Sequence, residues 1–110
     1  MEIVYAKEEK ASVVSVSGRM DGVSAPDFEQ KMVSWINEGE SNFVVDFGSL
    51  DYISSAGLRS ILVTAKKLKA KNGRLLLCSL KDTVKEVFEI SGFSSIVPIF
   101  DSVKAAVEEI

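Results

Sequence analysis

Strand-like segments that alternate with amphipathic helices are the feature that most limits how this chain can fold. Segments rich in β-branched and apolar residues predict five strands, at 3–7, 12–17, 42–47, 74–78 and 96–99. Apolar residues at helical spacing predict four helices, which begin after Ser24, near Leu58, at Asp82 and after Ser102. The element order ββαβαβαβα therefore predicts an α/β fold.

The connections between the predicted strands decide the direction in which neighbouring strands run. A helix between two strands lets the second strand run parallel to the first through a right-handed crossover. The first two strands are joined only by the charged turn from Glu8 to Lys10, so they are expected to pair antiparallel. The prediction is a mixed, mostly parallel sheet of about five strands with four helices and one antiparallel edge strand.

The predicted helix ends carry residues that often cap helices. Ser24 stands three residues before Asp27, close to a capping-box spacing, and Pro26 lies in the first turn. Gly39 is expected to end this helix, and the pair Asn72-Gly73 is expected to end the next one.

Length and composition exclude several classes of protein. The 110 residues are enough for one core and predict a single domain over residues 1–110. The net charge is −3 and the basic residues are dispersed, so nucleic acid is not an expected partner. The single cysteine forms no internal disulfide, and neither an export signal nor an apolar run long enough to span a membrane is visible. These features predict a cytoplasmic protein without membrane insertion.

The residues that usually perform catalysis are missing. The chain has no histidine, which removes Ser-His-Asp and Cys-His arrangements and the commonest metal ligand. The glycines of GSLDYISSAG match neither of the common phosphate-binding patterns, and Cys78 at the end of a strand is typical of a core residue. We therefore expect no catalytic residue, no cofactor, no metal and no small-molecule substrate.

Two serines stand side by side in LDYISSAGLRSIL, where an apolar strand gives way to a helix. In open α/β sheets the working surface lies beyond the carboxyl ends of the strands, which brings together the expected loops 18–24 and 48–56. Asp21, Asp51, Ser54 and Ser55 should share that end of the molecule. One serine is enough to cap the helix, so the second has no evident structural role.

The same stretch resembles a known family signature. DYISSAGLRSIL is similar to the motif of the STAS domain (sulphate transporter and anti-sigma factor antagonist), and specifically of the free-standing bacterial anti-sigma factor antagonists. GRMDGVSAP resembles the Gly-x-x-Asp loop of that family, and EISGFSSIVPIFDSVKAAV resembles its last turn, strand and helix. The resemblance covers almost the whole chain.

The resemblance implies a phosphorylation switch. The serine before a small residue and Gly-Leu is the phosphate acceptor of that family, which implies Ser55, ranked ahead of Ser54. The best-known members carry Asp where this chain has Ser54, and the Asp of the first loop, which contributes to the kinase contact, corresponds to Asp21. Expected partner-binding residues are Met20, Asp21, Gly22, Ser54, Gly57 and Leu58.

The resemblance also implies the partners. The unphosphorylated chain would bind an anti-sigma factor that is a serine kinase and so release the sigma factor, and a serine phosphatase would reset the phosphorylated form. Met20 and Val23 are candidates for exposed apolar anchors, although core packing is the first expectation for a single Met or Val. Asp21 has an alternative interpretation as a turn residue that bonds its own backbone.

Two other functions stay open from the sequence. A STAS module can be a scaffold or ligand-sensing part of a transporter or another regulatory complex. A small acyl- or phosphoryl-handling enzyme with Ser55 as its nucleophile is less favoured, because no histidine or nearby base is available.

Overall fold

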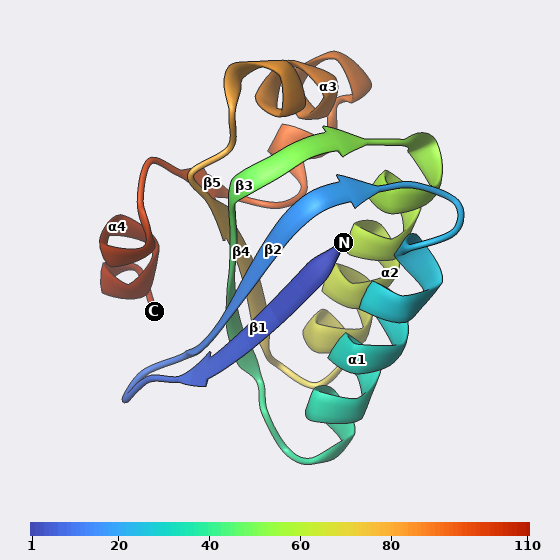
Figure 1. The fold of residues 1–110 in the computed structure, drawn as a ribbon. Helices are drawn as coiled ribbons and strands as arrows, with labels where there is room; N and C mark the ends of the chain where they lie inside the picture. The colour runs from blue at the N-terminus through green and yellow to red at the C-terminus, as the bar shows by residue number, and fades with distance from the viewer.

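Five strands form one mixed sheet in the order β1-β2-β3-β4-β5 in the computed structural model, which describes all 110 residues (Figure 1). The strands are β1 Glu2–Lys7, β2 Ser12–Met20, β3 Asn42–Ile53, β4 Arg74–Cys78 and β5 Ile99–Phe100. The helices are α1 Ala25–Asn37, α2 Ser55–Ala70, α3 Asp82–Ser91 and α4 Val103–Glu108, with a short 3-10 helix η1 Phe93–Ser95. Strand β1 is antiparallel to β2, and the other pairs are parallel, which confirms the predicted fold class.

The alternation of side chains along β3 builds two cores on opposite faces of the sheet. Phe43, Val45 and Phe47 join the larger core, which α1, α2 and α3 cover. Val44 points the other way, into a smaller core with Ala106 of α4. In Figure 1, α1 and α2 lie side by side against one face of the sheet, and α4 lies on the other. A strand buried on both faces explains why this segment reads as a continuous apolar run.

Helix α1 packs on the sheet through a stripe of residues one turn apart. Phe28, Met32 and Ile36 are buried, and each such side chain contributes about 1.5–3 kcal/mol when fully removed from water. Its last turn also holds the edge strand, because the Trp35 ring lies 4.6 Å from the Tyr5 ring of β1 between centroids. Gly39, with φ at 104°, follows the helix in a left-handed conformation, as its position in the sequence predicts.

The strands β2 and β3 run further than the sequence predicts. The segments 18–24 and 48–56 were expected as loops, but β2 continues to Met20 and β3 to Ile53. The two extensions pair with each other in parallel, from Gly18 opposite Leu50 to Met20 opposite Ile53, with register shifts beside Gly18. This pairing gives hydrogen bonds to glycine and polar residues that have little strand propensity of their own, so tertiary structure overrides the local signal.

The last strand is shorter and later than predicted. A strand at 96–99 was expected, but η1 occupies 93–95 and leaves Ile96 in a helical backbone conformation, with φ −100° and ψ −42°. Only Ile99 and Phe100 pair with β4. The prediction was wrong because a run of apolar residues does not distinguish a strand from a packed turn.

Candidate functional site

The carboxyl ends of β2 and β3 and the start of α2 meet in one corner, hereafter the serine corner (Ser54, Ser55 and the loop 21–24). The Ser54 N–H donates to the Met20 carbonyl oxygen over 2.9 Å, which ties the end of β3 to the end of β2. This bond brings the segments 18–24 and 48–56 together as the sequence predicts, although residues 18–20 and 48–53 are strand rather than loop.

Ser54 caps helix α2. Its backbone is extended, with φ −94° and ψ 175°, and its Oγ accepts a hydrogen bond from the Gly57 N–H over 3.3 Å. Its carbonyl oxygen accepts the Leu58 N–H over 2.9 Å. Such a cap is worth about 0.5–2 kcal/mol, so the half-buried Ser54 has a structural role.

Ser55 is the first residue of α2 and is exposed. Its hydroxyl makes no hydrogen bond within the chain, whereas the Ser54 hydroxyl does. The first turn of α2 carries no acidic residue, so a negative charge added here would meet the positive end of the helix dipole. The structure therefore separates the two serines into one that caps the helix and one whose hydroxyl is free.

Gly57 and Leu58 are buried beneath the serine corner. A Cβ atom on Gly57 would lie 2.7 Å from Cγ1 of Ile53 and 3.0 Å from the Met20 carbonyl oxygen. Leu58 is only 8% exposed and belongs to the larger core. Close approach of the α2 backbone to the ends of β2 and β3 thus requires glycine at this position.

Asp21 closes the turn that follows β2. Its Oδ1 accepts hydrogen bonds from the backbone N–H groups of Ser24 and Val23, over 3.1 and 3.0 Å. These bonds, first that of Ser24, lower the pKa of the Asp21 carboxyl from its usual value. Its bonds are those of a residue that organises its own turn, and its other carboxyl oxygen makes no hydrogen bond within the chain.

The capping role expected of Ser24 is wrong in detail. The Ser24 hydroxyl makes no cap bond to α1; it accepts the Asp21 N–H and donates to the Arg19 carbonyl oxygen, each over 2.9 Å. The Ser24 hydroxyl bonds the backbone of the turn instead of an N–H of the helix, because a serine side chain can bond to several nearby backbone groups.

The two apolar candidates in this loop separate cleanly. Met20 has no exposed surface and packs in the larger core, so core packing, the first expectation for this residue, is confirmed and the alternative of an exposed anchor is wrong. Val23, at 90% exposed, lies at the tip of the turn beside the exposed Gly22. Strand alternation explains the difference, because the side chain of Met20 at the end of β2 faces the core.

A hollow of about 350 Å³ lies beside the serine corner, between the first turns of α1 and α2. Gly22 and Pro26 line one side, and Ala56 and Arg59 line the other. Arg59 is exposed and in no ion pair, and it stands one turn after Ser55. Arg59 is not among the residues that the sequence predicts to bind a partner, and its i,i+4 spacing from Ser55 is the one sequence signal that points to it.

The flank of the corner carries one cation–π contact and one ion pair. Arg19 lies over the Tyr52 ring, 4.2 Å from its centroid, and Lys81 pairs with Asp51. Asp51, expected at this end of the molecule, is exposed there.

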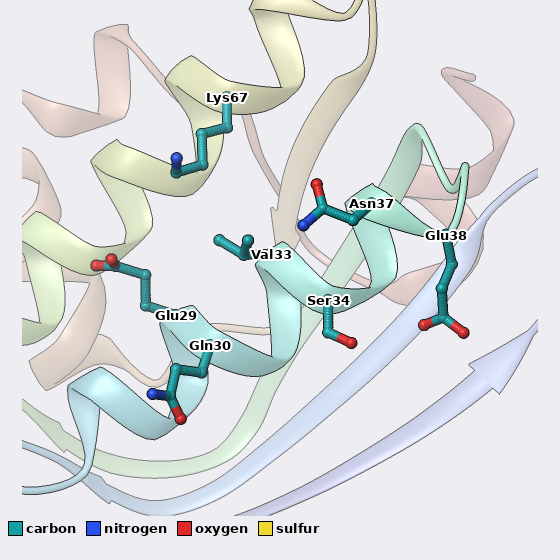
Figure 2. Close-up of a pocket in the computed structure, with 7 residues that line it drawn as sticks. All are labelled: Glu29, Gln30, Val33, Ser34, Asn37, Glu38 and Lys67. Carbon is teal, nitrogen blue, oxygen red and sulfur yellow. The ribbon is translucent and has the colours of Figure 1, made fainter.

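A larger hollow of about 650 Å³ lies further along the same two helices (Figure 2). Val33 is its one apolar lining residue; the others are Glu29, Gln30, Ser34, Asn37, Glu38 and Lys67. Figure 2 shows Lys67 of α2 and Glu29 of α1 reaching into the space between the helices. Ligand pockets are mostly apolar, and this polar lining is typical of a solvated groove between surface helices.

The single cysteine of the chain lies in the core. Burial raises the pKa of the Cys78 thiol to about 11, so it stays protonated at neutral pH, and the predicted core position is confirmed. No group of three or more potential metal-ligating side chains is present.

None of the helices combines the length and the apolar character that crossing a membrane requires.

Comparisons with known proteins agree on one family. A family model described as the STAS domain matches residues 2–106. BtrV of Bordetella bronchiseptica, whose name describes it as a candidate anti-sigma factor antagonist, is 42% identical over 106 residues, which cover 96% of this chain and 91% of that protein.

Two solved structures illustrate the shared fold. A candidate anti-sigma factor antagonist from Thermotoga maritima superposes with a TM-score of 0.94 at 20% identity, covering 98% of this chain and 93% of that one. The Bacillus anti-sigma factor antagonist SpoIIAA superposes in its unphosphorylated form with a TM-score of 0.85 at 21% identity, covering 98% and 95%. Its phosphorylated form gives 0.76 at 20% identity, covering 98% of each chain.

Proposed function

This chain belongs to the STAS domain family, and we propose that it acts as an anti-sigma factor antagonist that binds its anti-sigma factor through the serine corner. The name of BtrV, 42% identical over nearly the whole chain, supports this function. In this proposal the anti-sigma factor is a serine kinase, the unphosphorylated chain binds it and releases the sigma factor, and phosphorylation of Ser55 ends the interaction. A serine phosphatase restores the binding form.

The free hydroxyl of Ser55 is the observation that carries the proposal. It is exposed at a corner whose backbone is fixed by the Ser54 to Met20 hydrogen bond, and it has no partner within the chain. Ser54 is half-buried and its oxygen already accepts the Gly57 N–H, so Ser55 ranks first as the acceptor.

The fold tolerates the added charge. A phosphoserine carries about −1.5 to −2 charges at neutral pH. The helix dipole favours negative charge at the first residue of α2, and Arg59 one turn later offers a cation for an i,i+4 pair worth a few tenths of a kcal/mol. Phosphorylation therefore acts on the partner rather than on the fold.

A partner packed over the same corner is repelled. An acidic group of the partner about 5 Å from the phosphate is opposed by roughly 3 kcal/mol per unit charge at an effective dielectric of about 20. Because about 1.4 kcal/mol changes an affinity tenfold, one phosphate lowers the affinity about a hundredfold or more. No rearrangement of the domain is needed.

The proposed contact surface consists of exposed or half-buried residues. Asp21, Gly22, Val23, Ser54 and Ser55 contribute to it directly. The side chains of Met20 and Leu58, and the backbone of Gly57, support it from beneath, because all three are buried.

The test uses recombinant anti-sigma factors with serine kinase activity. The chain is incubated with each kinase and ATP, and the phosphate is located by mass spectrometry. We expect one phosphate on Ser55, none on the Ser55→Ala variant and normal phosphorylation of Ser54→Ala. Binding measured by calorimetry should be kept by Ser55→Ala and weakened about a hundredfold by Ser55→Asp.

The matched control is Ser34→Asp, because Ser34 is an exposed serine on α1 that lines the hollow of Figure 2, outside the serine corner. Its binding should equal that of the unchanged chain. Equal binding by Ser55→Ala and Ser55→Asp would overturn the switch, and phosphate found only on Ser54 would overturn the choice of acceptor.

A further inference from the structure

An apolar groove of about 510 Å³ lies at the outer edge of the sheet, between β4, the second half of α2 and the segment before β5. It is named here the edge groove. Leu62, Leu75 and Ile96 supply apolar lining, and Ile96 is 55% exposed. Its volume falls within the range of natural ligand sites, and its lining is more apolar than that of the hollow in Figure 2.

One backbone N–H group of β4, that of Leu75, has no partner on the groove side of the strand. The N–H groups of Leu77 and Ser79 donate outward, to the carbonyl oxygens of Pro98 over 2.9 Å and Phe100 over 3.0 Å. The Arg74 N–H donates inward, to Ser41 over 2.8 Å. Because successive residues of a strand face opposite sides, the N–H of Leu75 points outward.

The hydrogen-bond ladder stops before it reaches Leu75. Its register would place the Ile96 carbonyl oxygen opposite the Leu75 N–H, but η1 holds Ile96 in a helical conformation and no such bond forms. Only Leu77 and Cys78 pair with β5. The outer edge of β4 is thus open along Arg74–Leu76, and an open strand edge is the feature that strand addition by a peptide uses.

The charge around the groove is opposite to that of the whole chain. Lys66, Lys69 and Arg74 line it, and no carboxylate does, although the net charge of the chain is −3. All three are exposed and none forms a side-chain ion pair; the Arg74 guanidinium donates to the backbone carbonyl of Glu109. Three separate cations beside an apolar floor complement a segment with several carboxylates.

We propose that the edge groove binds an extended acidic peptide segment of a partner protein, which adds to the sheet beside Arg74–Leu76. The backbone of the peptide accepts the Leu75 N–H, an apolar side chain fills the space between Leu62 and Ile96, and its acidic residues face the three cations. An unpaired strand amide and several separated cations fit a peptide better than a small amphiphile with one carboxylate.

This surface is independent of the serine corner. Lys66 stands eleven residues after Ser55 on α2, a rise of about 16 Å along the helix. The two surfaces can therefore be occupied together, and the proposal does not rest on the function proposed above.

The test titrates the isotope-labelled chain with the peptide acetyl-EEVLVEE-amide and follows amide signals by NMR. We expect shifts at 73–77 and at Ile96 and Val97, and slower hydrogen exchange at Leu75. The matched peptide acetyl-KKVLVKK-amide should not bind. A version of the acidic peptide with N-methyl groups along the edge that pairs should lose most of its affinity, because N-methylation removes the strand hydrogen bonds.

Charge reversal on the chain supplies the second arm. The double variant Lys66→Glu, Lys69→Glu should bind the acidic peptide about tenfold more weakly, or weaker still. The control is the double variant Lys10→Glu, Lys31→Glu, which changes the net charge by the same amount outside the groove and should bind the peptide as the unchanged chain does. Thermal unfolding confirms that both double variants fold.

Several results would overturn the proposal. The first is the absence of NMR shifts at about 1 mM acidic peptide. The second is equal binding of the basic or the N-methylated peptide. The third is displacement of the acidic peptide by dodecanoate, a small amphiphile with one carboxylate, at a concentration lower than that of the peptide. Concentration-dependent dimerisation in sedimentation that Lys66→Glu with Lys69→Glu abolishes would also overturn it, because it would assign the groove to a second copy of the chain.

Discussion

Replacement of Gly57 with alanine tests whether close packing of α2 on the ends of β2 and β3 fixes the serine corner. The new Cβ would lie 2.7 Å from Cγ1 of Ile53, and 3.0 Å from both Cγ and the carbonyl oxygen of Met20. The side chains of Ile53 and Met20 are buried among other core residues, and the carbonyl oxygen belongs to the strand backbone. None of these atoms can move away without disturbing the core.

Two opposing effects set the size of the loss. Overpacking of this kind costs about 1–3 kcal/mol, and alanine in place of glycine inside a helix returns up to about 1 kcal/mol. The free energy of unfolding should therefore fall by about 1–2 kcal/mol. For a domain of this size that corresponds to a decrease of about 4–8 °C in the melting temperature.

Urea unfolding followed by circular dichroism measures this change, with melting temperatures as a check. Gly22→Ala is the matched control, because its Cβ would have no atom within 4 Å and its φ does not lie in the left-handed region. It should cost no more than about 0.5 kcal/mol. A Gly57→Ala variant as stable as the unchanged chain would refute the close-packing explanation.

Three further predictions concern single side chains. Ser54→Ala should lower the free energy of unfolding by about 0.5–2 kcal/mol in urea titrations, whereas Ser55→Ala should change it by less than about 0.5 kcal/mol, because only Ser54 caps α2. The pKa of Asp21 is lowered in the folded state, so its stabilising contribution is present at neutral pH and is lost as the pH falls below the usual aspartate pKa. Urea titrations at several pH values should therefore show that the free energy of unfolding of the unchanged chain exceeds that of Asp21→Asn by less in acid than at neutral pH. Cys78, with a pKa raised to about 11 by burial, should react with a thiol reagent at neutral pH only after unfolding, and rapid absorbance change in the native state would contradict this.

Local sequence patterns correctly predicted those helices and strands whose apolar residues are the ones that the fold buries. The predicted strand 74–78 coincides with β4, and the helix predicted to begin at Asp82 begins there as α3. A short apolar run and an amphipathic stripe each bury one consistent set of side chains. The same consistency placed Ser54 and Ser55 at a helix start and Cys78 in the core.

The serine corner required contacts between distant segments. The capping preference of serine does not distinguish Ser54 from Ser55. The structure separates them, because the Met20 carbonyl oxygen accepts the Ser54 N–H and the Ser54 side chain caps α2. The burial of Met20 likewise follows from the extra length of β2, which exists only because β3 runs beside it.

The amino-acid sequence alone established that this chain is an α/β domain with two serines at the start of a helix. Hydrophobic periodicity and helix capping act over a few neighbouring residues, so a short stretch of sequence is enough to predict them. Tertiary structure decided which hydroxyl is free, which apolar residues of the first loop are exposed, and where the sheet edge stays open beside Leu75. These outcomes depend on which backbone groups find partners in other segments, and no stretch of sequence carries that information by itself.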